Sequence, residues 1–172
     1  MASPPHHGSD DDPKDRTWPA RFADHLAGTD CPMCANDYTA QDIGWGLRLR
    51  VGEVSNAYLW RSGEVRGYCV VIYTARHVAE PTELSTDEAA AFWRDTLAVG
   101  HALESHYHPL KLNYLLLGNA IPHSHWHLVP RREAQHDPAP GGPIPFTHLD
   151  HGKQDEEQLQ RDAATLRSML AT

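Results

Sequence analysis

The stretch that decides the fold is residues 123–131, HSHWHLVPR, in which every second position from 123 to 127 is a histidine. In an extended strand successive side chains point to opposite faces, so this spacing places His123, His125 and His127 on one face. A rise of about 3.4 Å per residue separates neighbouring histidine Cα atoms by roughly 7 Å and the outer two by roughly 14 Å. One zinc ion with Zn–N bonds of about 2 Å accepts two of these imidazoles but not all three. At least one histidine therefore has a role other than binding a shared metal.

The opposite face of the same run has a different character. Trp126 and Leu128 lie there and suit a hydrophobic core, which indicates an interior strand with one face given to chemistry. The plain alternative is a solvated polar face. Histidine is the common acid, base and metal ligand near neutral pH, so three of them at strict period two favour the chemical interpretation.

The flanking segments indicate an α+β fold. Ser85-Thr-Asp-Glu88 is a capping box that begins a helix, and Pro109 ends that helix. Leu159 and Leu166 belong to a last amphipathic helix. Further strands are predicted at 47–51, 56–60, 68–73 and 112–117, and a loop at 136–145. Strands, helix, strands and helix in this order favour an α+β fold with an antiparallel sheet.

The composition sets limits on the class of protein. A chain of 172 residues, 40% hydrophobic and 22% charged, is predicted to form one soluble domain. The net charge of −8 argues against a broad surface for nucleic-acid polymers or membranes, while a local positive pocket still suits a small anionic substrate. The sequence shows neither an apolar run of about 18 residues nor the apolar core of a signal peptide. We therefore expect a cytoplasmic protein, whose three cysteines do not form a disulfide framework.

The pair Cys31-Pro-Met-Cys34 is the second chemical signal. Two thiolates at this spacing chelate one zinc ion, and a structural site needs four ligands. Because there is no second CxxC, histidines must complete the site, with His77 and one histidine of the triplet as the candidates. The rivals are a redox CxxC, whose usual βαβ context is absent here, and two unliganded thiols. Cys69 lies in an apolar segment and is expected to be inert core.

Polar residues also surround the histidine run. Asn113 and Asn119 bracket the apolar segment before it; both suit turns, and their amides also suit contacts to phosphate or ribose oxygens or to an imidazole. Arg131 and Arg132 end the run, where they either face solvent or bind phosphate.

Taken together, these motifs resemble the histidine triad (HIT) family. Its signature is His-φ-His-φ-His-φ-φ with φ apolar, and residues 118–131, GNAIPHSHWHLVPR, match it with Ser124 as the one departure. The resemblance runs over roughly residues 31–132. It includes the CPMC pair, the ARH sequence ending at His77 and the KLNYLLLGN segment at 111–119.

The resemblance implies a fold and a division of the chain. The family fold is a HIT-like α+β fold: a five-stranded antiparallel sheet with a long central helix and, here, a C-terminal helix. Residues 1–16 are rich in Pro, Asp, Ser and His and have no apolar periodicity, so their composition predicts a disordered N-terminal tail. The resemblance implies that residues 17–135 are the HIT-like catalytic domain. Residues 136–172 are expected to supply a loop and a C-terminal helix that pack on the same domain. Family members are commonly dimeric, so a homodimer is expected.

The resemblance also implies roles for particular residues. Family members hydrolyse or transfer nucleotides at an α-phosphate, which implies that His125 is the nucleophile and forms a covalent nucleotidyl-histidine. His127 would orient it and contact the phosphate or leaving group, with Asn113 and Asn119 as supporting nucleotide- and phosphate-binding residues. The chain is most similar to the zinc-bearing CxxC branch, which resembles diadenosine polyphosphate hydrolases, and this similarity implies a structural Zn²⁺. Its ligands would be Cys31, Cys34, His77 and His123.

The expected activity is therefore nucleotide hydrolysis, with a dinucleoside polyphosphate or an adenylyl conjugate as substrate. Three alternatives stay open. One is a zinc hydrolase that uses a His-x-His pair and an activated water. Another is a transferase that hands the nucleotide to a sugar phosphate. The last is a nucleotide-binding or interaction protein on the same scaffold with negligible turnover.

Overall fold

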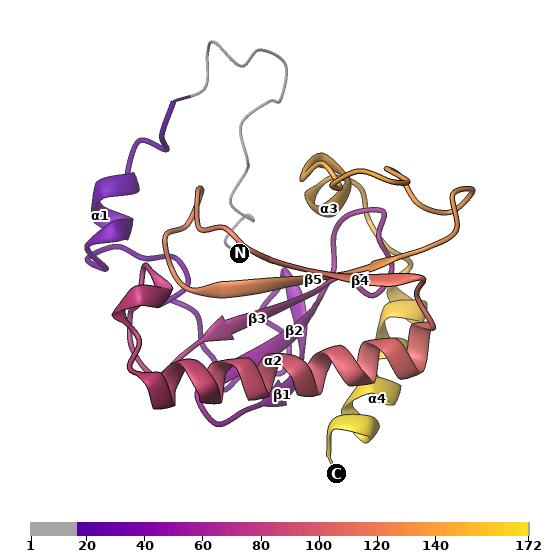
Figure 1. Ribbon diagram of the computed structural model, residues 1–172, viewed down its shortest axis with the longest axis horizontal. Coiled ribbons are helices and arrows are strands. Elements are labelled where there is room, and N and C mark those ends of the chain that lie inside the picture. The colour runs from indigo at the N-terminus through magenta and orange to yellow at the C-terminus, as the bar shows by residue number, and fades with distance from the viewer. Residues whose placement is uncertain (1–16, 172) are drawn as a thin grey trace.

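The computed structural model describes residues 17–171, and the tail predicted at residues 1–16 lies outside this range. The chain forms one five-stranded sheet in the order β1-β2-β3-β5-β4, with every neighbouring pair antiparallel (Figure 1). The strands are β1 (Gly46–Val51), β2 (Ser55–Trp60), β3 (Cys69–Tyr73), β4 (Lys111–Leu116) and β5 (His125–Arg131).

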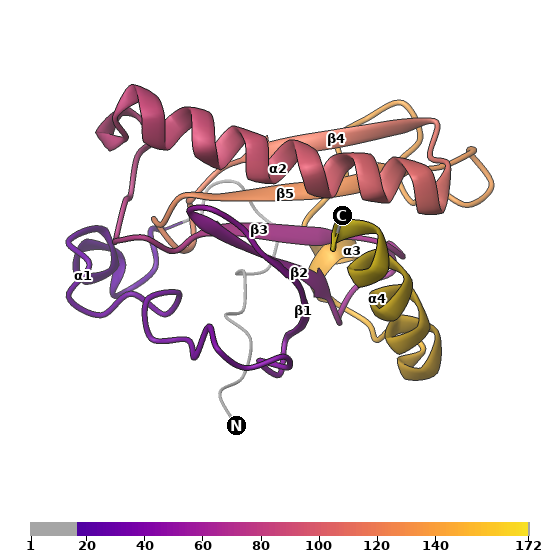
Figure 2. The ribbon, with the colours of Figure 1, turned by 90° about the horizontal axis from the view of Figure 1, so that it is seen from below.

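Two long helices cover one face of the sheet, as Figure 2 shows from their side. Helix α2 (Thr86–Tyr107) begins at the predicted capping box, where the Ser85 hydroxyl accepts a hydrogen bond from the Glu88 amide. Helix α4 (Glu156–Leu170) packs beside it and on β1. Leu103 of α2 and Leu166 of α4 are fully buried against the strands in the main core. Burial of such side chains, each contributing about 1.5–3 kcal/mol, holds this layer in place.

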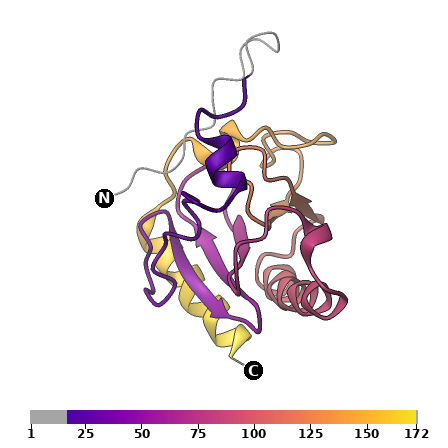
Figure 3. The same cartoon turned by 90° about the vertical axis from the view of Figure 1, so that its left-hand side faces the viewer.

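The opposite face carries shorter segments (Figure 3). They are α1 (Phe22–Leu26), the 31–43 segment, and the chain from 132 to α3 (Thr147–Asp150). Between them and the sheet lies a second apolar cluster, which includes Met33, Tyr58, Val70, Ile72 and Leu149. We call this side of the sheet the site face, because the histidines of β5 lie on it.

Two buried carboxylates tie the helices to the sheet connections. Asp95 of α2 accepts hydrogen bonds from the backbone amides of residues 53–55 and from the Ser55 hydroxyl. Asp162 of α4 accepts from Arg66 and Tyr107. A buried carboxylate is costly unless it is paired in this way. These contacts therefore fix the β1–β2 and β2–β3 connections on the helical layer.

The predicted α+β fold, with its five-stranded antiparallel sheet, long central helix and C-terminal helix, is confirmed. The main difference is at the histidine run, because β5 begins at His125 and His123 lies just before it. The short helices α1 and α3 have no counterpart in the predicted elements. Within residues 17–171, no helix combines the length and apolar character needed to cross a membrane.

Candidate nucleotide site and metal cluster

The strand β5 carries His125 and His127 inside the sheet, between β3 and the edge strand β4. In the antiparallel register His125 lies opposite Ile72, and His127 lies opposite Val70. Directly opposed residues project to the same face, so both imidazoles stand on the site face among buried apolar neighbours. Their ring centroids are 4.6 Å apart in an edge-to-face arrangement. The alternation read from the sequence thus describes these two histidines.

The third histidine belongs to a separate cluster. One ligand atom from each of Cys31, Cys34, His77 and His123 lies within 4.8 Å of the others. The Nδ1 atom of His123 is 3.5 Å from both sulfurs, and Nδ1 of His77 is 3.5 Å from the Cys34 sulfur. A tetrahedral ion with Zn–S bonds of about 2.3 Å and Zn–N bonds of about 2.0 Å holds its sulfur and nitrogen ligands about 3.5 Å apart. The cluster is therefore compatible with a four-ligand zinc site.

The outer nitrogens of the two cluster histidines support the same interpretation. The Nε2 atom of His123 is 2.7 Å from the Tyr73 carbonyl oxygen, and Nε2 of His77 is 3.3 Å from that of Leu26. A carbonyl oxygen only accepts, so both Nε2 atoms carry the proton and both Nδ1 lone pairs face the cysteines. Burial also lowers the pKa of His123, which favours its neutral, ligating form.

The cysteines themselves do not have the features of a redox pair. Burial and the neighbouring Cys31 sulfur raise the pKa of Cys34 to about 11, so the Cys34 thiol is not itself a reactive thiolate at neutral pH. Cys31 is buried just before a turn and Cys34 is exposed within that turn, and neither residue begins a helix. Cys69 is fully buried in β3, and burial raises its pKa.

Contacts on both sides of His77 hold its side chain in the cluster. The neighbouring Arg76 pairs with Glu88 in the first turn of α2, which anchors the chain after β3. On the other side, Gly28 follows α1 at φ +73°, and a Cβ there would lie 2.8 Å from the His77 ring. Only glycine takes both this backbone conformation and this close approach without strain. The turn after α1 therefore closes directly over His77.

His125 has a defined tautomer. Its Nδ1 atom is 2.5 Å from the backbone carbonyl oxygen of His123. Because that oxygen can only accept, Nδ1 of His125 carries the proton and Nε2 holds a lone pair. His123 thus contributes its side chain to the metal cluster and its carbonyl group to the orientation of His125.

His127 is held by a residue that the sequence did not single out. Its Nδ1 atom is 2.5 Å from the hydroxyl of Tyr68, which is fully buried. Burial keeps the pKa of Tyr68 well above its usual value, so the hydroxyl remains protonated. Among residues 17–171 this hydroxyl has no other hydrogen-bond partner, so it donates to Nδ1 and the proton of His127 resides on Nε2. His125 and His127 therefore present a lone pair and an N–H group, respectively.

Phe146 covers His127 from above, with its ring centroid 5.2 Å from the imidazole in an edge-to-face contact. Helix α3 follows Phe146 and packs on the β2–β3 connection, where the His148 carbonyl accepts from the Glu64 amide. At Gly63, with φ +85°, a Cβ would come within 2.2 Å of the Leu149 carbonyl oxygen. The absence of a side chain at Gly63 therefore allows α3 to approach closely enough to place Phe146.

The polar residues around the run lie in different settings. The side-chain oxygen of Asn113 accepts from Arg131, and Asn119 is exposed in the connection between β4 and β5. Arg131 is buried and pairs with Asp137, so of its two predicted alternatives the one in which it faces solvent is wrong. The Arg132 guanidinium donates to a backbone carbonyl and lies over the Tyr107 ring.

The fold and site together define an α+β protein with paired histidines on an interior strand beside a Cys₂His₂ cluster. Residues 53–134 match the family model of the HIT domain. The chain therefore carries a HIT domain, which confirms the resemblance inferred from the sequence. This family includes nucleotide-binding proteins and nucleotide hydrolases. A search of curated proteins found no match.

Solved structures of HIT proteins share the fold. A histidine triad protein from Bradyrhizobium japonicum has a TM-score of 0.66 and 20% identity, covering 73% of this chain and 91% of its own. A hypothetical histidine triad nucleotide-binding protein from Sulfolobus tokodaii has a TM-score of 0.57 and 18% identity, with 73% and 84% covered. A zinc-bound histidine triad family protein from Mycobacterium smegmatis has a TM-score of 0.57 and 21% identity, with 83% and 94% covered.

Proposed function

We propose that this protein hydrolyses nucleotides at the α-phosphate through a covalent nucleotidyl-histidine on His125. The substrate class is a dinucleoside polyphosphate or an adenylyl conjugate. The observation that carries the proposal is the hydrogen bond from Nδ1 of His125 to the His123 carbonyl, which leaves the Nε2 lone pair as the nucleophile. A neutral imidazole in this form attacks phosphorus without a separate base.

In the first step Nε2 of His125 attacks the α-phosphorus and forms a P–N bond. The bond from phosphorus to the leaving group breaks, and its electron pair departs with the leaving group. The Nε2–H of His127 supplies the proton that the leaving group needs. The positive charge that develops on the His125 ring is stabilised at Nδ1–H by the His123 carbonyl oxygen.

In the second step water attacks the same phosphorus and the P–N bond breaks. The electron pair returns to Nε2 of His125, and the proton of the water passes to Nε2 of His127. Both histidines then regain their starting protonation. Because the transition states spread negative charge over the phosphoryl oxygens, fixed N–H donors aimed at those oxygens supply much of the rate enhancement.

We also propose that the Cys₂His₂ cluster holds a structural zinc ion through Cys31, Cys34, His77 and His123. Four protein ligands fill a tetrahedral coordination sphere. The ion would hold the 31–34 turn against the chain that enters β5, and so fix the His123 carbonyl that orients His125. Within the described residues no other group of three potential ligands is found, which argues against the alternative of a zinc hydrolase with an open coordination position.

A nucleotide-binding protein without turnover is the remaining alternative. An isothermal titration with AMP, run beside a turnover assay with diadenosine triphosphate, separates the two functions. Binding together with release of AMP supports the hydrolase. Binding of AMP without any product from either a dinucleotide or an adenylyl amide would contradict it.

Substitution of Tyr68 is a test of the His127 assignment. Tyr68→Phe removes the hydroxyl that fixes the His127 tautomer, so proton delivery to the leaving group should weaken. A positioned general acid contributes about 10²- to 10⁴-fold, and we expect kcat for an adenylyl alkylamide to fall by about 10- to 100-fold. The nitrophenyl ester of AMP needs no proton on its leaving group, and its kcat should change less than about threefold.

The matched control is Tyr58→Phe, which removes another fully buried tyrosine hydroxyl on the site face. It should alter both substrates equally. Equal losses for both substrates in Tyr68→Phe would mean that this hydroxyl only stabilises the fold.

We further propose that the protein is a homodimer joined through β4. The outer edge of β1 is covered, because its Arg48 binds the Gln41 carbonyl and receives a hydrogen bond from Arg167 of α4. The outer edge of β4 has no such cover among residues 17–171, and Leu110 and Leu117 at its two ends are 71% and 43% exposed. An open strand edge with apolar ends is suited to pairing with a second copy.

Light scattering should therefore give a mass of twice the 19.2 kDa chain. The double variant Leu110→Glu, Leu117→Glu places like charges on the edge and is expected to run as a monomer. A wild-type protein that stays monomeric at 100-fold dilution and at high concentration alike would disprove the dimer without affecting the hydrolase proposal.

A further inference from the structure

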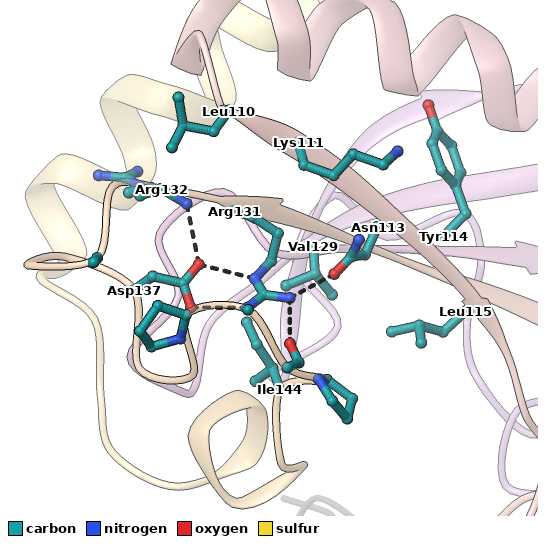
Figure 4. Close-up of a pocket in the computed structure, with 15 residues that line it drawn as sticks. Leu110, Lys111, Asn113, Tyr114, Leu115, Val129, Arg131, Arg132, Asp137 and Ile144 are labelled. Atoms are coloured by element: carbon teal, nitrogen blue, oxygen red, sulfur yellow. Dashed lines mark hydrogen bonds and ion pairs between the residues drawn. The ribbon is translucent and has the colours of Figure 1, made fainter.

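A pocket of about 680 Å³ opens on the site face between β4, β5 and the 132–144 segment (Figure 4). This volume is in the range of pockets that hold small organic ligands. The pocket lies apart from the metal cluster, which is at the other end of β5. The two-histidine mechanism does not by itself use this space.

Three neighbours connect the pocket to His127. Leu115 of β4 lies directly opposite His127 in the strand register and lines the pocket. Val129 is the next residue of β5 on the same face and also lines it. Ile144 lines the outer wall and precedes by two residues Phe146, which contacts His127. The pocket therefore begins at residues adjacent to His127 on the site face, and His127 itself, which is buried, is not among its lining residues.

Arg131 shapes the pocket wall. Its five N–H groups are all used: Nε and Nη2 bind Asp137, Nη2 also binds the Ala139 carbonyl, and Nη1 binds Asn113 and the Gly142 carbonyl. Figure 4 shows these contacts around the guanidinium. Because no donor remains, Arg131 holds the 132–144 segment in place and does not bind a ligand. Its positive charge is matched by Asp137, whose pKa it lowers to about 2.

The polarity of the lining changes with distance from His127. The nearest side chains, Leu115, Val129 and Ile144, are apolar, so a phosphate chain placed there would lose water without gaining partners. Asn113 and Lys111 follow further along the same face of β4, and Lys111 is about 14 Å from Leu115 at about 3.4 Å per residue. The Lys111 ammonium is exposed and uses one donor, to the Leu112 carbonyl. The pocket is thus apolar beside His127 and cationic at its far end.

We infer that this pocket is the subsite for the leaving group, and that it selects an apolar chain ending in a carboxylate. This inference rests on the proposed hydrolase activity and chooses between its two substrate classes. The preferred substrate is an adenylyl conjugate, in which AMP is joined through a P–N bond to such a chain. On reaction that bond breaks, the electron pair stays on the leaving nitrogen, and the nitrogen takes the proton from His127 as His125 bonds to phosphorus.

The test compares kcat/KM for four substrates: the AMP amides of ammonia, octylamine and 8-aminooctanoic acid, and diadenosine triphosphate. Each buried methylene contributes about fourfold in affinity. The kcat/KM of the octylamide should therefore exceed that of the simple amide by at least 10-fold. The kcat/KM of the aminooctanoate conjugate should exceed that of the octylamide by a further several-fold. The dinucleotide should rank below both chain-bearing amides.

Two variants locate the effect. Lys111→Gln should reduce the preference for the carboxylate-bearing chain over octylamide to about one, whereas Lys153→Gln, a matched exposed lysine outside the pocket, should preserve it. Gly142→Phe projects a ring from a position where an added Cβ meets no atom within 4 Å. This substitution should lower the kcat/KM ratio of octylamide to the simple amide by at least 10-fold and leave AMP binding unchanged.

The outcomes separate the two proposals. Failure of all four substrates to react would overturn the hydrolase and this subsite with it. Hydrolysis with equal kcat/KM for the three amides, or with the dinucleotide preferred, would overturn the subsite alone. Weaker AMP binding in a folded Gly142→Phe protein would show that the pocket holds the nucleoside, and that result also contradicts the inference.

Discussion

Replacing His125 by alanine is expected to abolish hydrolysis, with a fall in kcat of at least about 10³-fold. Loss of a covalent nucleophile commonly costs this much or more, because the remaining donors bind the phosphate but offer no attacking atom. Intact-protein mass spectrometry of the wild type, quenched during turnover, should show a fraction of chains heavier by one nucleotidyl group. Digestion should place that group on the peptide containing residues 123–131. The alanine variant should show neither the product nor the adduct.

The control for this prediction is His101→Ala, which removes a histidine exposed on α2, on the opposite side of the sheet. It should keep both activity and adduct formation. If the His125 variant retained full turnover while remaining folded, the nucleophile would have been assigned to the wrong residue.

Loss of one cysteine of the cluster is expected to have the largest effect on stability. Purified wild-type protein should contain about one zinc per chain, as a closed four-ligand site requires. Structural metal sites supply several kcal/mol of folding free energy, and in a domain of this size each kcal/mol shifts Tm by about 2–4 °C. Cys31→Ala should therefore lose the zinc and lower Tm by more than about 10 °C.

Cys69→Ala provides the matched control, because Cys69 is equally buried but lies away from the cluster. It should keep its zinc and lower Tm by only a few degrees, as expected for a small core cavity. A metal-free wild type with undiminished stability, or the same small loss of Tm in both variants, would contradict the zinc assignment.

The parts of the fold that follow from local patterns could be predicted. The capping box at Ser85 and the apolar stripe behind it gave the start and face of α2. The histidines at every second position indicated that one face of β5 carries the chemical side chains. The spacing argument also indicated that the three histidines do not all bind one ion, and the structure brings His123 together with the cysteine pair. The family resemblance, rather than spacing, indicated which histidine would join that pair.

The contacts that tune the site could not be predicted, because they join residues far apart in sequence. Tyr68 reaches His127 only because β3 pairs with β5 in a register that sets Val70 opposite His127. A single tyrosine at the start of a predicted apolar strand carries no signal of that pairing. For Arg131 the sequence likewise left two alternatives, a solvent-exposed strand end or a phosphate contact. Its burial depends on Asp137 in a loop whose course no local pattern defines.

The central claim is that two displacements occur at phosphorus, the first by His125 and the second by water. The stereochemical course tests this most directly, using a substrate whose α-phosphorus is chiral through sulfur and oxygen isotopes. Each in-line displacement inverts phosphorus, so two of them should return a nucleoside phosphorothioate with retained configuration. An inverted product would show a single attack by water, and would contradict the nucleotidyl-histidine.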